Sequence, residues 1–111
     1  MGKLNVLVAG STGYIGIQLI KHLCIHTKIN IKYLCGNSSV GKNISLYDKT
    51  LTKYKLPRIV KFNKKYLFDV DIVFTALPNG EAQILSNLLL PHNILIDLSA
   101  DFRITNTSVY K

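Results

Sequence analysis

The sequence predicts an α/β protein with an open, doubly wound and mostly parallel sheet. Short apolar runs alternate with stretches of helical periodicity along the 111 residues, which is the pattern of parallel strands joined by crossover helices. A glycine-rich turn follows the first apolar run. Hydrophobic residues make up 48% of the chain and charged residues 18%, a balance that fits one folded domain and argues against intrinsic disorder.

The first elements have the clearest patterns. Residues 4–9 (LNVLVA) form a short apolar run bounded by glycine, which predicts a buried strand. A helix is predicted after the glycine turn, because apolar residues recur at helical spacing from Gly16 to Leu23. Residues 29–35 (INIKYLC) alternate between apolar and polar types and predict a second strand that enters a polar loop.

The later elements depend on shorter patterns and on proline. Pro57 divides the stretch before the third strand, and Pro78 ends a buried strand. Asn79 is a candidate N-cap for the helix that follows. The predicted elements are a strand at 58–62, a short helix at 64–68, a strand at 71–77, a helix at 81–90 and a last strand at 94–98.

The net charge of +8 raises the question of an anionic partner. The lysines are scattered, and the combined pattern of aromatic and arginine residues that is typical of a nucleic-acid-binding surface is missing. No apolar run approaches a signal-peptide core or the ~18 residues of a membrane span. We therefore expect a cytoplasmic protein with neither a nucleic-acid nor a membrane partner. Cys24 and Cys35 lack metal-ligand spacing, so we expect small buried hydrophobic residues and no metal site.

Three glycines, Gly10, Gly13 and Gly16, stand three residues apart where the first strand meets the helix. Glycine costs roughly 0.5–1 kcal/mol against alanine in a helix, so this pattern indicates a tight turn that something approaches closely. A Rossmann-type dinucleotide fold has its phosphate-binding turn at this point. There Gly10 would make the turn, residues 11–14 would supply amides and Gly16 would allow close packing. A tight turn without a ligand is the alternative.

The loop after the second strand bears on the choice of nucleotide. An NAD site usually has an acidic residue there for the ribose hydroxyls, and residues 34–42 contain none. The loop offers Asn37, Ser38, Ser39 and Lys42, which are suited to a phosphate. This composition favours NADP(H) as the cofactor, with an ordinary polar loop as the alternative.

Two further segments are VDIVFTALPNGEAQ at 70–83 and LIDLSADFR at 95–103. With VLVAGSTGYIG at 6–16, they resemble the N-terminal part of the N-acetyl-gamma-glutamyl-phosphate reductase family over nearly the whole chain. The resemblance implies an NADPH-dependent oxidoreductase of arginine biosynthesis. In that family a cysteine thiolate displaces phosphate from an acyl phosphate, and the thioester accepts hydride to give the semialdehyde. The family's Gly-Cys-Tyr motif is not in this chain, so no catalytic residue is predicted.

The resemblance also implies roles for individual residues. Ser38 matches a serine of the loop that holds the adenosine phosphate, where Asn37 replaces a usual arginine and Lys42 could compensate. Asn79 replaces a common histidine and is either a ligand contact or a helix cap. The implied cofactor-binding residues are Gly10, Ser11, Thr12, Gly13, Tyr14, Ile15, Gly16, Asn37, Ser38, Ala76, Leu77, Pro78 and Asn79.

The resemblance further implies that residues 1–111 are the cofactor-binding domain of a two-domain enzyme, incomplete without its catalytic and substrate part. The full-length enzyme is expected to be a homo-oligomer that acts on a small acyl phosphate. Ser99, Asp101 and Arg103 match the signature loop, and we favour a structural role over a substrate contact. The alternatives are a non-catalytic NADP-binding module, an aspartate-semialdehyde dehydrogenase relative, or an extended short-chain dehydrogenase. The last lacks support because no Tyr-x-x-x-Lys pair occurs.

Overall fold

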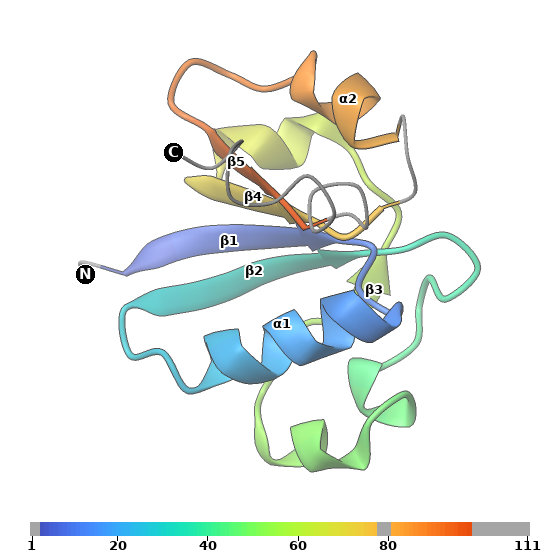
Figure 1. Cartoon of the computed structure of the whole chain (residues 1–111). Coiled ribbons are helices and arrows are strands. Elements are labelled where there is room, and N and C mark those ends of the chain that lie inside the picture. The colour runs from blue at the N-terminus through green and yellow to red at the C-terminus, as the bar shows by residue number, and fades with distance from the viewer. Residues whose placement is uncertain (1–2, 78–80, 99–111) are drawn as a thin grey trace, which may run out of the picture.

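A five-stranded parallel sheet lies at the centre of the computed structural model, which describes residues 3–77 and 81–98 (Figure 1). The order β3-β2-β1-β4-β5 places the point where the connections change direction beside β1. The predicted fold class is confirmed. The strands are β1 (Leu4–Ala9), β2 (Ile29–Cys35), β3 (Ile59–Val60), β4 (Ile72–Thr75) and β5 (Ile94–Asp97).

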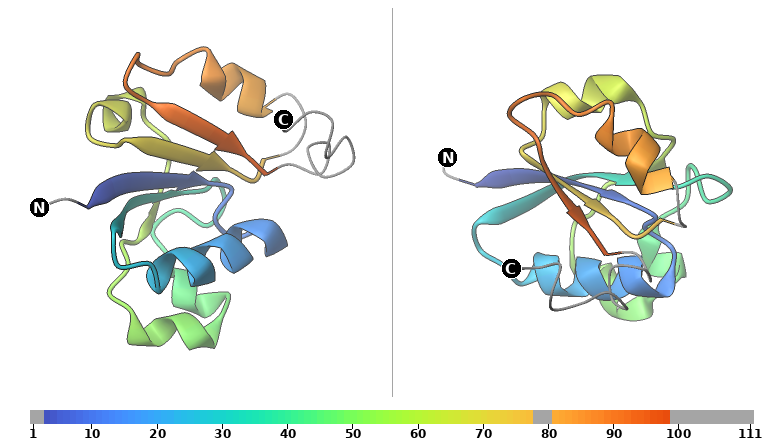
Figure 2. Two further views of the ribbon diagram at one scale, coloured as in Figure 1. Left: turned by 60° about the vertical axis from the view of Figure 1, so that its left-hand side comes forward. Right: turned by 45° about the horizontal axis from the view of Figure 1, so that its top comes forward.

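Helical segments cover both faces of the sheet, as a doubly wound fold requires. One face carries α1, η1 and η2, and the other carries η3 and α2 (Figures 1 and 2). The α-helices are α1 (Tyr14–Cys24) and α2 (Glu81–Ser86), and the 3₁₀ segments are η1 (Ile44–Leu46), η2 (Lys49–Lys53) and η3 (Lys64–Phe68).

The core has two parts because successive side chains of a strand point to opposite faces. Val6 and Val8 of β1 pack with Ile20 of α1 on one face. Leu7 packs with Leu85, which follows the first turn of α2, on the other face. Both faces of β1 are buried, which explains why its sequence is apolar without alternation.

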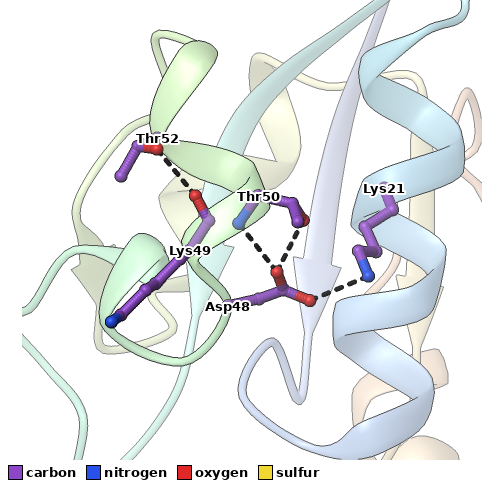
Figure 3. Close-up of polar contacts among 5 residues, drawn as sticks. All are labelled: Lys21, Asp48, Lys49, Thr50 and Thr52. Atoms are coloured by element: carbon purple, nitrogen blue, oxygen red, sulfur yellow. Dashed lines mark hydrogen bonds and ion pairs between the residues drawn. The ribbon is translucent and has the colours of Figure 1, made fainter.

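An ion pair ties α1 to the segment between β2 and β3 (Figure 3). Lys21 Nζ lies 2.9 Å from Asp48 Oδ2. Asp48 is the N-cap of η2, and its Oδ1 accepts from the Thr50 amide at 2.9 Å and from the Thr50 hydroxyl. These hydrogen bonds, first from the Thr50 side chain and then from Lys21, lower the pKa of Asp48 to about 2.

Several elements are shorter than predicted. The third strand has two residues instead of the five of 58–62, because Pro57 has no amide to extend it and the chain leaves the sheet after Val60. The helix predicted over 81–90 ends at Ser86. There the amides of Leu88 and Leu89 turn to acceptors three residues back, which tightens and ends the helix. The predicted cap Asn79 lies outside the described residues.

Within residues 3–77 and 81–98, no helix combines the length and the apolar character needed to cross a membrane. The same part of the chain brings no three His, Cys, Asp or Glu side chains together in a way that could hold a metal ion.

Candidate functional site

A cleft of about 590 Å³ opens where the carboxyl ends of β1, β2 and β4 meet. Ligands of open α/β sheets bind at this kind of position, next to the strand where the connections change direction. The lining combines the turn after β1, the loop after β2, the chain after β4 and one side of α2. Its residues are Ala9, Gly10, Thr12, Gly13, Cys35, Gly36, Asn37, Ser38, Ser39, Phe62, Ala76, Leu77, Glu81, Ile84, Leu85 and Leu88.

Two of the three glycines in the turn after β1 are required by the fold. Gly10 has a φ of +83°, and a Cβ there would stand 2.6 Å from the carbonyl oxygen of Ala76. A Cβ on Gly16 would collide with the carbonyl oxygen of Gly10. The expected tight turn at Gly10 and the close packing at Gly16 are therefore confirmed.

Gly13, the middle glycine, is not required by the fold. It is the N-cap of α1, with a φ of −73° and a ψ of 165° that any residue can adopt. Among the described residues, a Cβ on Gly13 would meet only the carbonyl oxygen of Gly10, at an ordinary 3.7 Å. Gly13 is exposed and lines the cleft. The missing side chain therefore leaves open space on the cleft side of the helix N-terminus.

Ser11 links the turn to the last residue of β2. Its side chain is fully buried, and its Oγ lies 3.0 Å from the carbonyl oxygens of Val8 and Cys35, which share its one hydroxyl proton. The amide of Ser11 donates to Cys35 as well, at 3.2 Å. Ser11 therefore fixes the position of the turn with groups that were expected to face a ligand.

The expected set of four free amides, from residues 11–14, is smaller in the structure. Besides Ser11, the amide of Gly13 is engaged, since it donates to the carbonyl oxygen of Gly10 at 3.3 Å. Within the described ranges, no backbone acceptor is found for the amides of Thr12 and Tyr14. The first amides of α1 also have no partner inside the helix, and they stand at the positive end of its dipole. These groups favour an anionic ligand.

The loop after β2 forms the opposite wall of the cleft. Two successive turns shape it: Val40 N donates to Asn37 O at 3.4 Å, and Lys42 N donates to Ser39 O at 3.1 Å. Asn37 and Ser38 are exposed and line the cleft. Residues 36–42 include no acidic side chain. The wall is therefore polar without being negative, which suits a phosphate better than a ribose diol.

The remaining wall is apolar and was not predicted as part of the site. Phe62 after β3 lines the cleft together with Ile84 and Leu88, and Ile84 is 66% exposed. Leu85 turns into the core between them. The signal in the sequence was Ile84 and Leu88, four residues apart and outside the buried stripe of α2, but their partner Phe62 becomes evident only from the fold.

The predicted site residues are only partly brought together. Ser11 and Gly16 are buried beneath the turn, Tyr14 is 80% exposed, and neither they nor Ile15 contribute to the lining. Lys42 is exposed and also stands outside the lining. Seven of the predicted residues line the cleft: Gly10, Thr12, Gly13, Asn37, Ser38, Ala76 and Leu77. Predictions for five positions lie outside the described residues: Pro78, Asn79, Ser99, Asp101 and Arg103.

Cys35 lies in the floor of the cleft but is not prepared for nucleophilic chemistry. The residue is buried, as expected for a small hydrophobic side chain, and burial raises the pKa of its thiol to about 12. Cys24 is only half-buried, less than expected, and burial raises its thiol pKa as well. Both side chains therefore stay protonated at neutral pH, whereas a nucleophilic cysteine reacts as the thiolate.

Comparison with known proteins relates this cleft to a family. Residues 5–111 match the family model described as semialdehyde dehydrogenase, NAD binding domain. The chain is 37% identical over 111 residues to an N-acetyl-gamma-glutamyl-phosphate reductase of Ehrlichia ruminantium (strain Gardel), an alignment that covers 98% of this chain and 32% of that protein. It is 40% identical over 109 residues to the protein of that name from Brachyspira hyodysenteriae, and this alignment covers 97% of this chain and 31% of that protein.

A solved structure supports the fold. The crystal structure of aspartate semialdehyde dehydrogenase with NADP from Candida albicans superimposes with a TM-score of 0.61 at 20% sequence identity, over 91% of this chain and 31% of that one. The present chain spans about a third of the length of the curated relatives that it matches. The sequence match over residues 5–111, on a Rossmann-like fold, shows that the chain belongs to the family of semialdehyde dehydrogenase NAD-binding domains.

Proposed function

We propose that this chain is the NADPH-binding part of an N-acetyl-gamma-glutamyl-phosphate reductase. The reaction reduces N-acetyl-gamma-glutamyl phosphate to N-acetylglutamate 5-semialdehyde with release of phosphate, and the cofactor supplies the hydride. Two relatives at 37% and 40% identity carry this name. They support the assignment over the third of their length that aligns with this chain. That the whole enzyme also has a catalytic and substrate-binding part is proposed.

The observation that carries the proposal is Gly13. Gly10 and Gly16 are explained by the backbone, while the position of Gly13 would accept a side chain without strain. A glycine that the fold does not need, at the N-terminus of a helix and in the lining of a cleft, is explained by a ligand that approaches the backbone closely. The pyrophosphate of a dinucleotide is such a ligand.

The rest of the cleft fits the other parts of the cofactor. The turn after β1 would hold the pyrophosphate through backbone amides and the helix dipole. The apolar wall of Phe62, Ile84 and Leu88 would exclude water from a flat ring. The loop with Asn37 and Ser38, which has no carboxylate, would receive the adenosine ribose with its 2′-phosphate.

In this proposal the residues of this chain bind and orient the cofactor, and the covalent step takes place on residues outside this chain. Displacement of phosphate needs a thiolate, and the two thiols here have raised pKa values. The proposal therefore assigns the nucleophile to the part of the enzyme that this chain does not contain. A cytoplasmic location and a homo-oligomeric full-length enzyme remain predictions within the same proposal.

Titration of the 111-residue chain with NADPH, followed by two-dimensional ¹H–¹⁵N NMR, tests the binding role. Saturable shifts are expected for the amides of Thr12, Gly13, Asn37 and Ser38, while Lys28, at the opposite end of the sheet, stays unshifted. We expect weak binding and no phosphate-dependent oxidation of the semialdehyde by the chain alone. Absence of saturable shifts at millimolar NADPH, or shifts confined to residues outside the cleft, would refute the proposal.

A further inference from the structure

Glu81 is the only acidic residue among the described residues that line the cleft. It is the first residue of α2, its side chain is exposed, and Ile84, Leu85 and Leu88 line the cleft with it. Residues that stand three, four and seven positions apart lie on one side of a helix. The four residues therefore form a stripe that begins with a carboxylate and continues with apolar side chains.

The carboxylate of Glu81 is not neutralised by the described part of the protein. The ion pair found there joins Lys21 to Asp48, and no described residue forms a hydrogen bond with the Glu81 side chain. An acidic residue in the first turn of a helix is stabilising through the helix dipole. That effect does not require a place in the lining of a cleft, so it leaves the position of Glu81 unexplained.

A carboxylate in this cleft opposes the phosphate groups of the proposed cofactor. Like charges repel, and the repulsion is stronger near a protein surface than in bulk water. An ionised carboxylate can only accept hydrogen bonds, so Glu81 is compatible with a dinucleotide where it meets a donor of that ligand. The donors of a dinucleotide are the amine of the adenine, the hydroxyls of the two riboses and the carboxamide of the nicotinamide.

The loop after β2 and the strand β3 are tied together at the side of the cleft where the adenosine is proposed to lie. Gly36, the first residue of the loop, donates its amide hydrogen to Val60 O at 3.0 Å. Further along the loop, Gly41 N donates to Ile59 O at 2.7 Å, and Ile59 N donates to Lys42 O at 2.9 Å. The chain that leaves β3 therefore stays beside this loop.

The apolar wall consequently lies at the adenosine end of the cleft. Phe62 follows β3 by two residues and lines the cleft together with Ile84 and Leu88. A flat base packs on such side chains, whereas a ribose has no flat apolar face. The nicotinamide belongs to the other end of the cofactor. The donor that fits the apolar stripe and its carboxylate is therefore the amine on the edge of the adenine ring.

We propose that Glu81 accepts a hydrogen bond from the exocyclic amine of the adenine and makes the cleft selective for this base. The inference rests on the proposed function, because it takes NADPH as the ligand. Ile84 and Leu88 would pack on any purine, and apolar contacts discriminate weakly between rings of the same shape. A base with a carbonyl oxygen in place of the amine would bring two acceptors together, which a site built for a donor rejects.

The test compares NADPH with deamino-NADPH, in which hypoxanthine replaces adenine and a carbonyl oxygen replaces the amine. Dissociation constants are measured with the 111-residue chain by NMR titration at low ionic strength. We expect the native chain to bind NADPH about tenfold more tightly than the deamino form. Glu81→Gln should bring the two constants within about threefold, because an amide both donates and accepts. The ratio of the constants isolates the contact, since loss of the negative charge strengthens the binding of both probes.

Asp48→Asn is the matched control. It makes the same change from carboxylate to amide at a residue outside the cleft lining, and it should leave the ratio at its native value. Glu81→Ala removes the acceptor altogether and should lose the preference as well, so it decides the question if Glu81→Gln does not fold.

The outcomes separate this inference from the proposed function. If the native chain binds both probes at the cleft without preference, or if the variants of Glu81 keep the native ratio, the role of Glu81 is wrong and the proposed function stands. Equal weakening of both probes by Glu81→Gln would show that Glu81 acts through the helix alone. If neither probe shifts the cleft residues of the native chain, the proposed function fails together with this inference.

Discussion

Replacing Gly13 with asparagine should weaken NADPH binding while leaving the fold intact. Gly13 is the N-cap of α1 and has no side-chain cap. Asparagine is among the best N-cap residues and differs from glycine by only a few tenths of a kcal/mol, in the stabilising direction. The new Cβ would meet a single atom at 3.7 Å, so no strain opposes the change.

The loss of binding follows from the same geometry. The asparagine Oδ1 would accept a hydrogen bond from the backbone amide of Ile15 or Gly16 in the first turn of α1. The side chain would also occupy the cleft next to these amides. Loss of a charge-assisted hydrogen bond to phosphate costs about 1.5–3 kcal/mol, equivalent to a roughly ten- to hundredfold weaker affinity. Urea unfolding and NADPH titration measure the two quantities side by side, with Gly13→Ala as the smaller control. Equal losses of stability and affinity would show that Gly13 serves the fold, and an unchanged affinity would show that no ligand approaches Gly13 closely.

Two further predictions concern the stability of the fold. Gly10 and Gly41 both have a left-handed backbone, with φ of +83° and +89°, but a Cβ meets Ala76 O only at Gly10. Gly41→Ala should therefore cost about 1–2 kcal/mol in unfolding free energy and Gly10→Ala clearly more, and the reverse order in urea unfolding would contradict this account. The pKa of Asp48 is lowered from 3.8 to about 2. The contribution of Asp48 to the unfolding free energy is therefore complete above pH 3.8 and is lost as the pH falls through 2. Between about pH 5 and about pH 2, the native chain should lose more unfolding free energy than Asp48→Asn, and parallel pH profiles would argue against the role of this carboxylate.

The fold could be predicted where burial leaves a continuous pattern in the sequence. β1 is buried on both faces, so residues 4–9 are apolar without interruption, and its limits were predicted correctly. The segment around η1 and η2 could not be assigned, because 3₁₀ turns of three and five residues are too short to show a period. The end of α2 depends on local hydrogen bonds after Ser86 and not on its apolar spacing.

The candidate site divides along the same line. The turn after β1 is visible in the sequence because a tight backbone turn restricts it to glycine. The direction of a side chain is not visible, and Ser11 points into the protein although its neighbours face the cleft. Phe62 and Ile84 could not be assigned to the site either, because they come from separate elements that meet only when the sheet is assembled.

The bonds between the loop after β2 and Ile59 also bear on association with other molecules. Gly36 pairs with Val60 on the β2 side of β3, so the amide and carbonyl groups of Ile59 point to the outer edge, where Gly41 and Lys42 already bond them. A sheet edge with unpaired groups is a template for intermolecular β-addition and aggregation. The chain closes this edge with its own backbone. The other edge of the sheet, at β5, lies on the far side from the loop after β2, so a strand added there would leave this loop undisturbed.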